Sequence, residues 1–436
     1  MPAASASTRL TFAWNGIKRV HVSTLAPLRL CWRSHIFRKL IYPELLYGSD
    51  SDQHQERAEM KILSVFGTRP EALKMAPLVA LLAKTPGVTS VVCSTGQHQS
   101  MLEQVLELFG IQVAHNLGLM VPNQTLNDLC SRMLKAIDPV LEAEKPDRIL
   151  VHGDTSTAMI CALAAFHHRI PIGHVEAGLR THDLSQPWPE EMNRRVVDIV
   201  SDLLFAPTQI AKQNLLRENL AGRIVVTGNT VIDSLRQTAE KIDTNTVLKA
   251  ALDLQLPLLA EGQKLLLVTG HRRENFGSGF ENICNALAKI SERTDIQVVY
   301  PVHLNPKVRG PVEQKLGNLP NVHLIAPLDY LHFVRIMQRA DVILTDSGGV
   351  QEEAPSLGKP VLVMREVTER PEAVAAGTVE LVGTQTERIQ AAVHRLMDDS
   401  DGSRTKVTVS NPYGDGHASQ RIVASILQRP FEEFSG

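Results

Sequence analysis

The segment from Leu344 to Val361, LTDSGGVQEEAPSLGKPV, predicts a strand, a turn, a helix and a second strand in direct succession. Leu344 ends an apolar run, and the diglycine at 348–349 makes a turn without side-chain bulk. Gly358 and Pro360 then end the helix, and PVLVM continues as the next strand. This order of elements is the building unit of a parallel α/β sheet.

The same segment also suits a nucleotide diphosphate. Ser347, Gly348 and Gly349 precede a helix whose first backbone N–H groups have no partner within the helix and favour an anion. Glu353, one turn into that helix, is placed to accept hydrogen bonds from a ribose. An ordinary strand-turn-helix junction is the alternative for this segment by itself, so the rest of the chain has to decide.

The composition is that of a globular protein with two or three domains. The chain has 436 residues, of which 43% are hydrophobic and 21% are charged. The net charge of -2 gives no overall electrostatic reason to expect nucleic acid or an anionic membrane as a partner. No apolar run reaches the roughly 18 residues that a membrane-spanning helix needs.

The cysteines predict neither a disulfide framework nor a zinc site, and no other metal site is predicted. They are odd in number, scattered and without a CxxC pair. Their positions are Cys31, Cys93, Cys130, Cys161 and Cys284. This usage favours the cytoplasm as the compartment.

Residues 1–59 differ from the rest of the chain. Up to Pro43 they contain seven Lys and Arg residues and no acidic residue. A transit peptide is one interpretation, but the stretch lacks amphipathic order, and Met60 precedes the first clear strand. We therefore expect a poorly ordered leader, or upstream sequence read into the protein, rather than a domain.

From residue 61 onward, short apolar runs alternate with helical periodicity. The first series is KILSVF, SVVCST, RILVH, IGHV, LLFA and RIVVT, and the second is KLLLVT, IQVVYPV, VHLI, DVILT, PVLVM and VELV. These runs predict parallel strands that are covered on both faces by helices. We expect two doubly wound α/β domains, 60–228 and 229–416, which bind a ligand between the carboxyl ends of their strands.

Polar residues follow several of these predicted strands. Arg69 and Lys74 come after the first strand, where Thr68 and Glu71 have the spacing of a capping box, so both cations lie near a helix N-terminus that favours phosphate. A well-capped helix with an exposed arginine is the alternative.

Acidic residues follow two further strands. Asp154 and Glu176 each follow a buried strand, where partial desolvation would make them plausible proton carriers, although either could simply cap a helix. Glu190 lies in PWPEEMNRR, which we interpret as a rigid polar loop lining a site.

The second half of the chain adds a basic cluster. His271 follows the strand KLLLVT and is next to Arg272, so its role is expected to depend on a bound diphosphate. A surface cluster that balances its own charges is the alternative. His303 and Arg370 are weaker signals. The absence of HExxH, Walker, GxGxxG and GxSxG motifs argues against zinc hydrolysis, P-loop chemistry, a dinucleotide fingerprint and a serine esterase.

Taken together, these motifs closely resemble the bacterial, non-hydrolysing UDP-N-acetylglucosamine 2-epimerase family. The matching motifs are FGTRPE, HGDTST, GHVEAGLRT, PWPEEMNRR, TGNTVIDSL, TGHRREN, PVHLNP, TDSGGVQEEAPSLGKPVLVMR, TERPEAV and NPYGDG. They follow one another in one colinear order from Lys61 to Gln428. The resemblance implies the GT-B architecture, in which two Rossmann-like doubly wound parallel-sheet domains face a central cleft, and a C-terminal helix, 417–434, that crosses back to the first domain.

The resemblance also implies the reaction. Family members interconvert UDP-GlcNAc and UDP-ManNAc by eliminating UDP to give 2-acetamidoglucal and adding it back on the inverted carbon. No cofactor is needed for this route. The resemblance further implies a homodimer that supplies ManNAc units for cell-surface polysaccharides.

Site roles follow from the matching motifs. Asp154, Glu176 and Glu190 resemble the acid/base carboxylates, and His271 resembles the residue that assists the leaving phosphate. The substrate-binding positions implied are Arg69, Lys74, Asp154, Glu176, His271, Leu328, Phe333, Ser347, Gly348, Gly349, Glu353 and Arg370. Leu328 departs from the family, which more often has Gln near the uracil.

Members of the family can bind a second UDP-GlcNAc as an activator. The positions implied are Gln97, Ser100, Arg132, Glu190, Arg272 and His303. Gln99 and Ser100 depart from the usual residues there, which predicts weaker activation. The rival interpretations are a hydrolysing epimerase, a GT-B glycosyltransferase that needs an acceptor, and an inactive UDP-sugar sensor.

Overall fold

The computed structural model describes residues 59–96, 99–260, 262–399 and 410–436. The predicted leader lies outside these residues, apart from its last residue, Glu59. In the described part of the chain, no helix is long and apolar enough to cross a membrane.

The first half forms a seven-stranded parallel sheet in the order β3-β2-β1-β4-β5-β6-β7. Its strands are β1 (Met60–Phe66), β2 (Val88–Ser94), β3 (His115–Asn116), β4 (Arg148–His152), β5 (Ile172–Val175), β6 (Leu203–Ala206) and β7 (Arg223–Val226). The helices that connect them are α2 (Arg69–Leu82), α3 (Gln99–Phe109), α4 (Leu126–Glu144), α5 (Ser156–His167), α6 (Glu190–Val200) and α7 (Gln209–Arg217). All six strands predicted in this half are present.

The second half forms a six-stranded parallel sheet in the order β10-β9-β8-β11-β12-β13. Its strands are β8 (Lys264–Thr269), β9 (Ile296–Pro301), β10 (Val322–Ile325), β11 (Val342–Thr345), β12 (Val361–Val363) and β13 (Val379–Leu381). Its helices and short 3₁₀ turns are α9 (Thr246–Gln255), η1 (Arg273–Asn275), α10 (Ser278–Ile290), α11 (Pro306–Leu316), α12 (Tyr330–Arg339), α13 (Gly348–Glu353), η2 (Ala354–Leu357), α14 (Pro371–Ala375) and α15 (Thr386–Met397).

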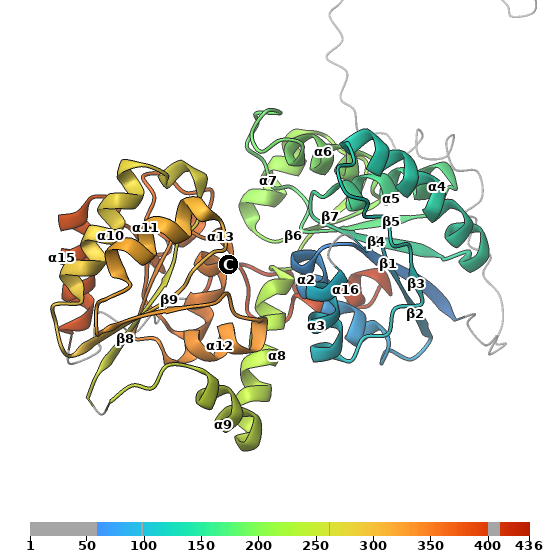
Figure 1. Ribbon diagram of the computed structural model, residues 1–436. Helices are drawn as coiled ribbons and strands as arrows, with labels where there is room; N and C mark the ends of the chain where they lie inside the picture. Colours follow the sequence, from blue (N-terminus) through green and yellow to red (C-terminus); the bar gives the residue numbers. More distant parts are fainter. Residues whose placement is uncertain (1–58, 97–98, 261, 400–409) are drawn as a thin grey trace, which may run out of the picture. The chain divides into compact units, whose positions relative to one another are not determined.

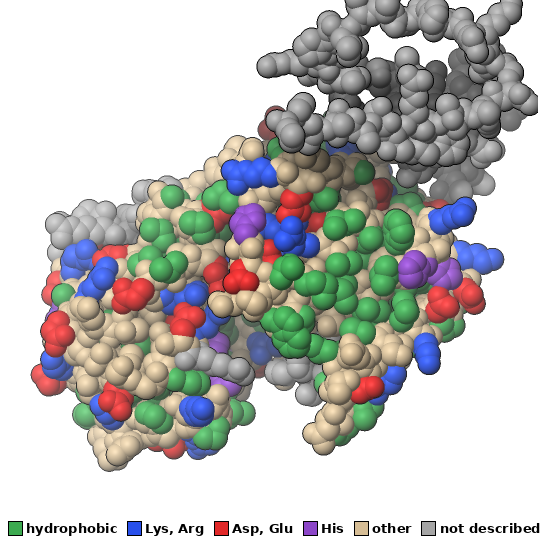
Figure 2. Space-filling view, turned by 90° about the horizontal axis from the view of Figure 1, so that it is seen from above, with side chains coloured by type: hydrophobic (Ala, Val, Ile, Leu, Met, Phe, Trp, Pro, Cys, Tyr) green, Lys and Arg blue, Asp and Glu red, His purple; other side chains and the backbone are tan. Residues whose placement is uncertain are grey.

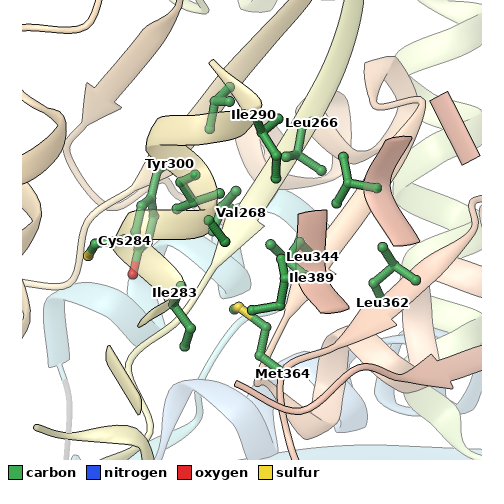
Figure 3. Close-up of a cluster of buried hydrophobic side chains, with 14 of the residues drawn as sticks. Leu266, Val268, Ile283, Cys284, Ile290, Tyr300, Leu344, Leu362, Met364 and Ile389 are labelled. Carbon is green, nitrogen blue, oxygen red and sulfur yellow. The ribbon is translucent and has the colours of Figure 1, made fainter. Parts of the chain in front are cut away.

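Both sheets are covered on their two faces, as the apolar strands predict (Figure 1). In the first half, α2 and α3 pack on one face, and α4, α5 and α6 pack on the other. In the second half, Leu266, Val268 and Leu344 of neighbouring strands face Ile283 and Ile290 of α10 (Figure 3). The fold is therefore the expected pair of doubly wound α/β sheets.

Two helices join the halves. Helix α8 (Thr230–Thr244) follows the first sheet and packs against α2, α12 and α13. Helix α16 (Ala418–Ile426) comes after the second sheet, yet Ile422, Val423 and Ile426 are buried in the core of the first. The chain after the second sheet therefore returns to the first sheet, where α16 covers part of the range 417–434. The helix ends at Ile426, where Gln428 adopts left-handed backbone with a φ of 54° and the N–H of Arg429 bonds back to the carbonyl of Ala424 at 2.8 Å.

Candidate active site between the two sheets

The strand order reverses once in each sheet, and several of the predicted site residues follow the strands at these two places. In the first sheet the switch falls between β1 and β4, which are followed by Arg69 and Asp154. In the second it falls between β8 and β11, which are followed by His271 and Ser347. Crevices at the carboxyl ends of strands next to such a switch are the usual ligand sites of open α/β sheets.

A cavity of about 320 Å³ brings several of these residues together. Lys74, Asp154 and Glu176 line it from the first half, and Arg370 lines it from the second half. Arg194 of α6 adds a further cation. Arg180, Glu369 and Glu372 complete the charged lining, which has four carboxylates and four cations. Cations and carboxylates around one small cavity suit an anionic ligand with a proton to move.

Glu176 follows β5 in left-handed backbone conformation, with a φ of 69°. Its Oε1 accepts from Lys74 Nζ at 2.5 Å and from Asn229 Nδ2 at 2.9 Å. The ring of His152, on the neighbouring strand, approaches Oε2 with its Nε2 at 3.5 Å. Burial opposes ionisation, but the nearby cations Lys74 and Arg370 lower the pKa of Glu176 far below its ordinary value. Glu176 is therefore a carboxylate that is ionised and held in place.

Asp154 lies in the loop between β4 and α5. Its carboxylate forms an ion pair with Arg194, and its backbone carbonyl accepts from Asn193 Nδ2 at 2.9 Å. Arg194 is in turn held by the buried Glu191, which accepts from its Nη1 at 3.2 Å. The N-terminal part of α6 therefore fixes the orientation of Asp154.

The PWPEEMNRR segment differs from its predicted form. It is a loop only up to Pro189, because Glu190 begins helix α6. Glu190 is half-buried and makes no side-chain hydrogen bond or ion pair with any described residue. Glu191 is fully buried and accepts from the backbone N–H groups of Thr181 and His182 at 3.1 and 3.2 Å. Sequence reasoning had singled out Glu190, and the structure adds Glu191 as the carboxylate that organises this loop.

His271 lies at the carboxyl end of the second sheet, next to the buried Asp346. The carboxylate of Asp346 accepts from the backbone N–H groups of His271 and Arg272 at 2.9 and 2.8 Å, and the His271 ring stands 3.8 Å away from it. Burial lowers the pKa of His271 against the opposing charge of Asp346. The ring also stacks on that of His303, with centroids 5.3 Å apart. Asp346 and His303 thus hold the exposed imidazole of His271 at the carboxyl end of the second sheet.

Gly348 and Gly349, which the sequence predicted as a turn, are the first two residues of helix α13, and two arginines lie beside Gly348. A Cβ atom placed on Gly348 would lie 3.6 Å from Arg272 Nη2 and 3.8 Å from Arg370 Nη2. A side chain at this position would therefore fill the space in front of both guanidinium groups. Arg370 also forms an ion pair with Glu352, which is buried and which sequence reasoning did not identify.

A second cavity, of about 420 Å³, lies beside Arg69. Arg69 lines it from the first half, and Tyr330 and Leu331 line it from the second half. The hydroxyl of Tyr330 donates to Glu353 Oε1 at 2.9 Å. Burial raises the pKa of Glu353 to about 7. The half-buried Leu328 and Phe333 belong to the same apolar cluster as Tyr330, so the residues predicted for ribose and base lie in one region.

The predicted activator residues are only partly described. Gln97 lies outside the described residues, as does the side chain of Ser100. Arg132, on α4, donates to Gln124 and to the backbone carbonyl of Asp128. Arg272 lies beside Gly348 at the start of α13, and the ring of His303 stacks on that of His271.

The described residues contain no cluster of potential metal ligands. No group of three or more His, Cys, Asp or Glu side chains among them is arranged to hold an ion.

Comparison with known proteins gives consistent results. The sequence model of the family described as UDP-N-acetylglucosamine 2-epimerase matches residues 80–427. A UDP-N-acetylglucosamine 2-epimerase of Escherichia coli K12 is 55% identical over 369 residues, which are 84% of this chain and 98% of that protein. A crystal structure of the Neisseria meningitidis UDP-GlcNAc 2-epimerase bound to UDP-GlcNAc is 48% identical, with a TM-score of 0.78, and the match covers 85% of this chain and 100% of that one. These likenesses confirm the predicted GT-B architecture.

Proposed function

Because the chain belongs to the UDP-N-acetylglucosamine 2-epimerase family, and is therefore an isomerase, we propose that it interconverts UDP-GlcNAc and UDP-ManNAc by eliminating UDP and adding it back. The observation that carries this proposal is the cavity shared by Lys74, Asp154, Glu176 and Arg370. It combines cations for a diphosphate with carboxylates for a proton, and the reaction requires both.

The chemistry explains why both are needed. The hydrogen on C2 of the sugar is hardly acidic while UDP is attached. When the C1–O bond breaks, its electron pair leaves with the UDP oxygen and C1 becomes positive. A carboxylate then takes the C2 proton, and the C2–H electrons form the C1–C2 double bond of 2-acetamidoglucal. Return of a proton to the other face of C2, and of the UDP oxygen to C1, gives the epimer.

Asp154 and Glu176 are the proposed proton carriers. Each is held by a cation, Arg194 in the case of Asp154 and Lys74 in the case of Glu176. General acid and base groups of this kind contribute about 10² to 10⁴ in rate. Glu190 stays a third proposed carboxylate, at the start of α6.

The UDP is proposed to lie along the second half. Lys74 and Arg370 would meet its diphosphate together with Ser347, Gly348 and Gly349, and His271 would donate to the departing phosphate oxygen. Such positioned donors stabilise the charge that develops on the leaving group. The nucleoside would occupy the 420 Å³ cavity, with Arg69 beside it, Glu353 on the ribose, and Leu328 and Phe333 near the uracil.

A second UDP-GlcNAc is proposed as an activator next to this site, through Gln97, Ser100, Arg132, Glu190, Arg272 and His303. The stacking of His303 on His271 supports the proposal, because it would join an activator contact to the leaving-group site. We expect sigmoidal kinetics in UDP-ManNAc that become hyperbolic when UDP-GlcNAc is added. Hyperbolic kinetics from the outset would remove the activator site.

A homodimer is proposed as the working form. Hydrophobic side chains gather on the face of the molecule that carries α5 and α6 (Figure 2). Phe166, Trp188, Met192 and Ile199 are exposed there, and patches of this kind mark interaction sites. We further propose a cytoplasmic enzyme that supplies ManNAc for polysaccharide synthesis, with domains 60–228 and 229–416 and the tail assigned to the first.

Incubation of the protein with UDP-GlcNAc alone in D2O tests the function. We expect UDP-ManNAc, together with deuterium at C2 of both sugars. Release of free UDP and ManNAc would indicate a hydrolysing enzyme instead. Unchanged UDP-GlcNAc without deuterium would overturn the epimerase.

Variants at the two carboxylates test the proposed roles. We expect Glu176→Gln and Asp154→Asn to lower kcat by about 10² or more, because each removes a proton carrier. Calorimetric titration should show that both still bind UDP. Near-normal turnover of either variant would remove that residue from the mechanism.

A further inference from the structure

We propose that Asn229 and Glu352 form a buried bridge that positions Arg370 for the diphosphate and Glu176 for the proton. This inference rests on the proposed function and assigns roles to two residues outside its machinery. Asn229 and Glu352 belong to the motifs TGNTVIDSL and TDSGGVQEEAPSLGKPVLVMR. Neither residue was predicted to have a role.

Asn229 is the central member of the bridge. Its Nδ2 donates to Glu176 Oε1 at 2.9 Å and to Glu352 Oε2 at 3.2 Å. Its Oδ1 accepts from the backbone N–H of Val231 at 3.1 Å, so the same side chain caps helix α8. Because the cap fixes one end of the amide, the donor end has to face the two carboxylates.

Glu352 holds the orientation of Arg370. Its Oε1 pairs with Nε of Arg370, and Nη1 of the arginine donates to the backbone carbonyl of Glu369 at 3.2 Å, which leaves Nη2 for another partner. Arg370 Nη2 is the atom that a Cβ on Gly348 would approach to 3.8 Å. The ion pair therefore directs Nη2 of the guanidinium toward Gly348, at the start of helix α13, where phosphate is proposed to bind.

The segment 411–413, which follows the second sheet, makes hydrogen bonds to the backbone of both members of the bridge. Asn411 Nδ2 donates to the backbone carbonyl of Glu352 at 2.7 Å, and the carbonyl of Tyr413 accepts from the backbone N–H of Asn229 at 2.6 Å. Glu352 and Asn229 are only 3% exposed each. These contacts give the NPYGDG motif a task, which is to fix both members of the bridge from one loop.

The effect of Glu352→Gln on UDP affinity shows whether Glu352 positions Arg370 or acts only through its negative charge. Removal of a negative charge beside a diphosphate site should, by charge alone, strengthen the binding of UDP. If Glu352 instead positions Arg370, the same change should weaken UDP binding by roughly 10-fold or more, because misplaced groups can cost up to about 100-fold. The two accounts therefore predict opposite results.

A double-mutant cycle tests whether Glu352 acts through Arg370. UDP affinity is measured by calorimetry for the full chain, Glu352→Gln, Arg370→Met and the double variant. We expect Glu352→Gln to weaken binding in the full chain and to have no further effect in the Arg370→Met background. Equal losses in both backgrounds, or tighter binding by Glu352→Gln, would overturn the bridge. Glu144→Gln is the matched control, because it breaks ion pairs with Lys61 and His115 far along α4.

Asn229→Asp tests the other member of the bridge. Aspartate keeps the acceptor that caps α8 but places a third carboxylate next to Glu176 and Glu352. We expect a lower thermal unfolding temperature, because the added carboxylate is buried beside two others, and a kcat at least about 10-fold lower. Asn229→Ser, which keeps a cap without the added charge, should retain more activity than Asn229→Asp. Wild-type turnover by Asn229→Asp would contradict the proposal.

These outcomes are independent of the overall reaction. Turnover of the unaltered protein in D2O decides the proposed function, whereas the coupling between positions 352 and 370 is read from UDP binding, which needs no turnover. A protein that binds UDP with this coupling but does not epimerise would refute the function and keep the bridge.

Discussion

Two buried carboxyl groups of the site have opposite pKa directions, and their neighbours explain the difference. Burial by itself favours the protonated form of both Glu176 and Glu353, yet the pKa of Glu176 is lowered and that of Glu353 is raised. Lys74 and the other cations outweigh burial at Glu176, whereas Glu353 receives one hydrogen bond from the neutral hydroxyl of Tyr330. One carboxyl is therefore firmly ionised, and the other titrates near neutral pH.

The titration of Glu353 predicts a pH-dependent stability. Its pKa is about 7 in the folded protein, against 4.5 for the unfolded group, so folding favours the protonated form. The free energy of unfolding should thus fall as the pH rises from 4.5 through 7, by up to about 3 kcal/mol from this residue. Glu353→Gln removes this contribution, because glutamine does not titrate. The free energy of unfolding of the variant, relative to that of the unaltered protein, should therefore be higher at pH 8 than at pH 5.

Urea denaturation at both pH values measures the effect. The exposed Glu240→Gln is the control and should show no such difference. An equal stability difference between Glu353→Gln and the unaltered protein at pH 5 and pH 8 would contradict the assignment.

At the residue scale, the sequence identified side chains that directly follow strands. Asp154 and Glu176 could be predicted because a polar residue that follows an apolar run lies at the carboxyl end of a strand, where ligands bind. Asn229 and Glu352 could not, because their partners lie far along the chain and the contact depends on how the halves pack. The choice between Glu190 and Glu191 likewise depends on where helix α6 begins.

At the scale of elements, helix α2 shows how a cap can serve a site. Thr68 and Glu71 form the predicted capping box at its N-terminus. Glu71 is buried and also accepts from Thr155 Oγ1 at 2.6 Å and from the backbone N–H of Gly67 at 3.1 Å. It therefore joins the start of α2, which carries Lys74, to the loop that carries Asp154.

Replacement of Glu71 should lower the free energy of unfolding by more than the loss of an exposed helix cap does. We expect Glu71→Ala to lower the free energy of unfolding by roughly 2–3 kcal/mol, because it leaves buried donors without partners. Asp128→Ala is the matched control, since Asp128 completes the same kind of capping box with Thr125 on the exposed start of α4. Chemical denaturation compares the two variants, and equal losses would show that burial adds nothing.

The strands were the most predictable elements, and β3 shows the limit. Every predicted apolar run is a strand, because burial on both faces gives a continuous apolar pattern. Strand β3 has only two residues, His115 and Asn116, and exists because they pair with Cys93 and Ser94 of β2. No local pattern can indicate a strand that depends so fully on its neighbour.

At the scale of the whole molecule, the tail completes the first half. Ile422 of α16 is fully buried in the core that Phe66 and Met75 also form. We expect Ile422→Ala to lower the free energy of unfolding by roughly 2–4 kcal/mol through loss of buried methyl groups. Gln420→Ala, on the exposed side of the same helix, should change it by less than about 0.5 kcal/mol. A small effect of Ile422→Ala in urea denaturation would mean that the tail only rests on the first half.

The crossing of α16 also sets an order in time. A ribosome adds about 5–20 residues per second, so the roughly 190 residues between Val226 and Ala418 take on the order of 10–40 s to make. Throughout that interval the first sheet lacks Ile422, Val423 and Ile426 over one of its faces. This apolar surface of the first half is therefore covered only after the whole second half has been synthesised.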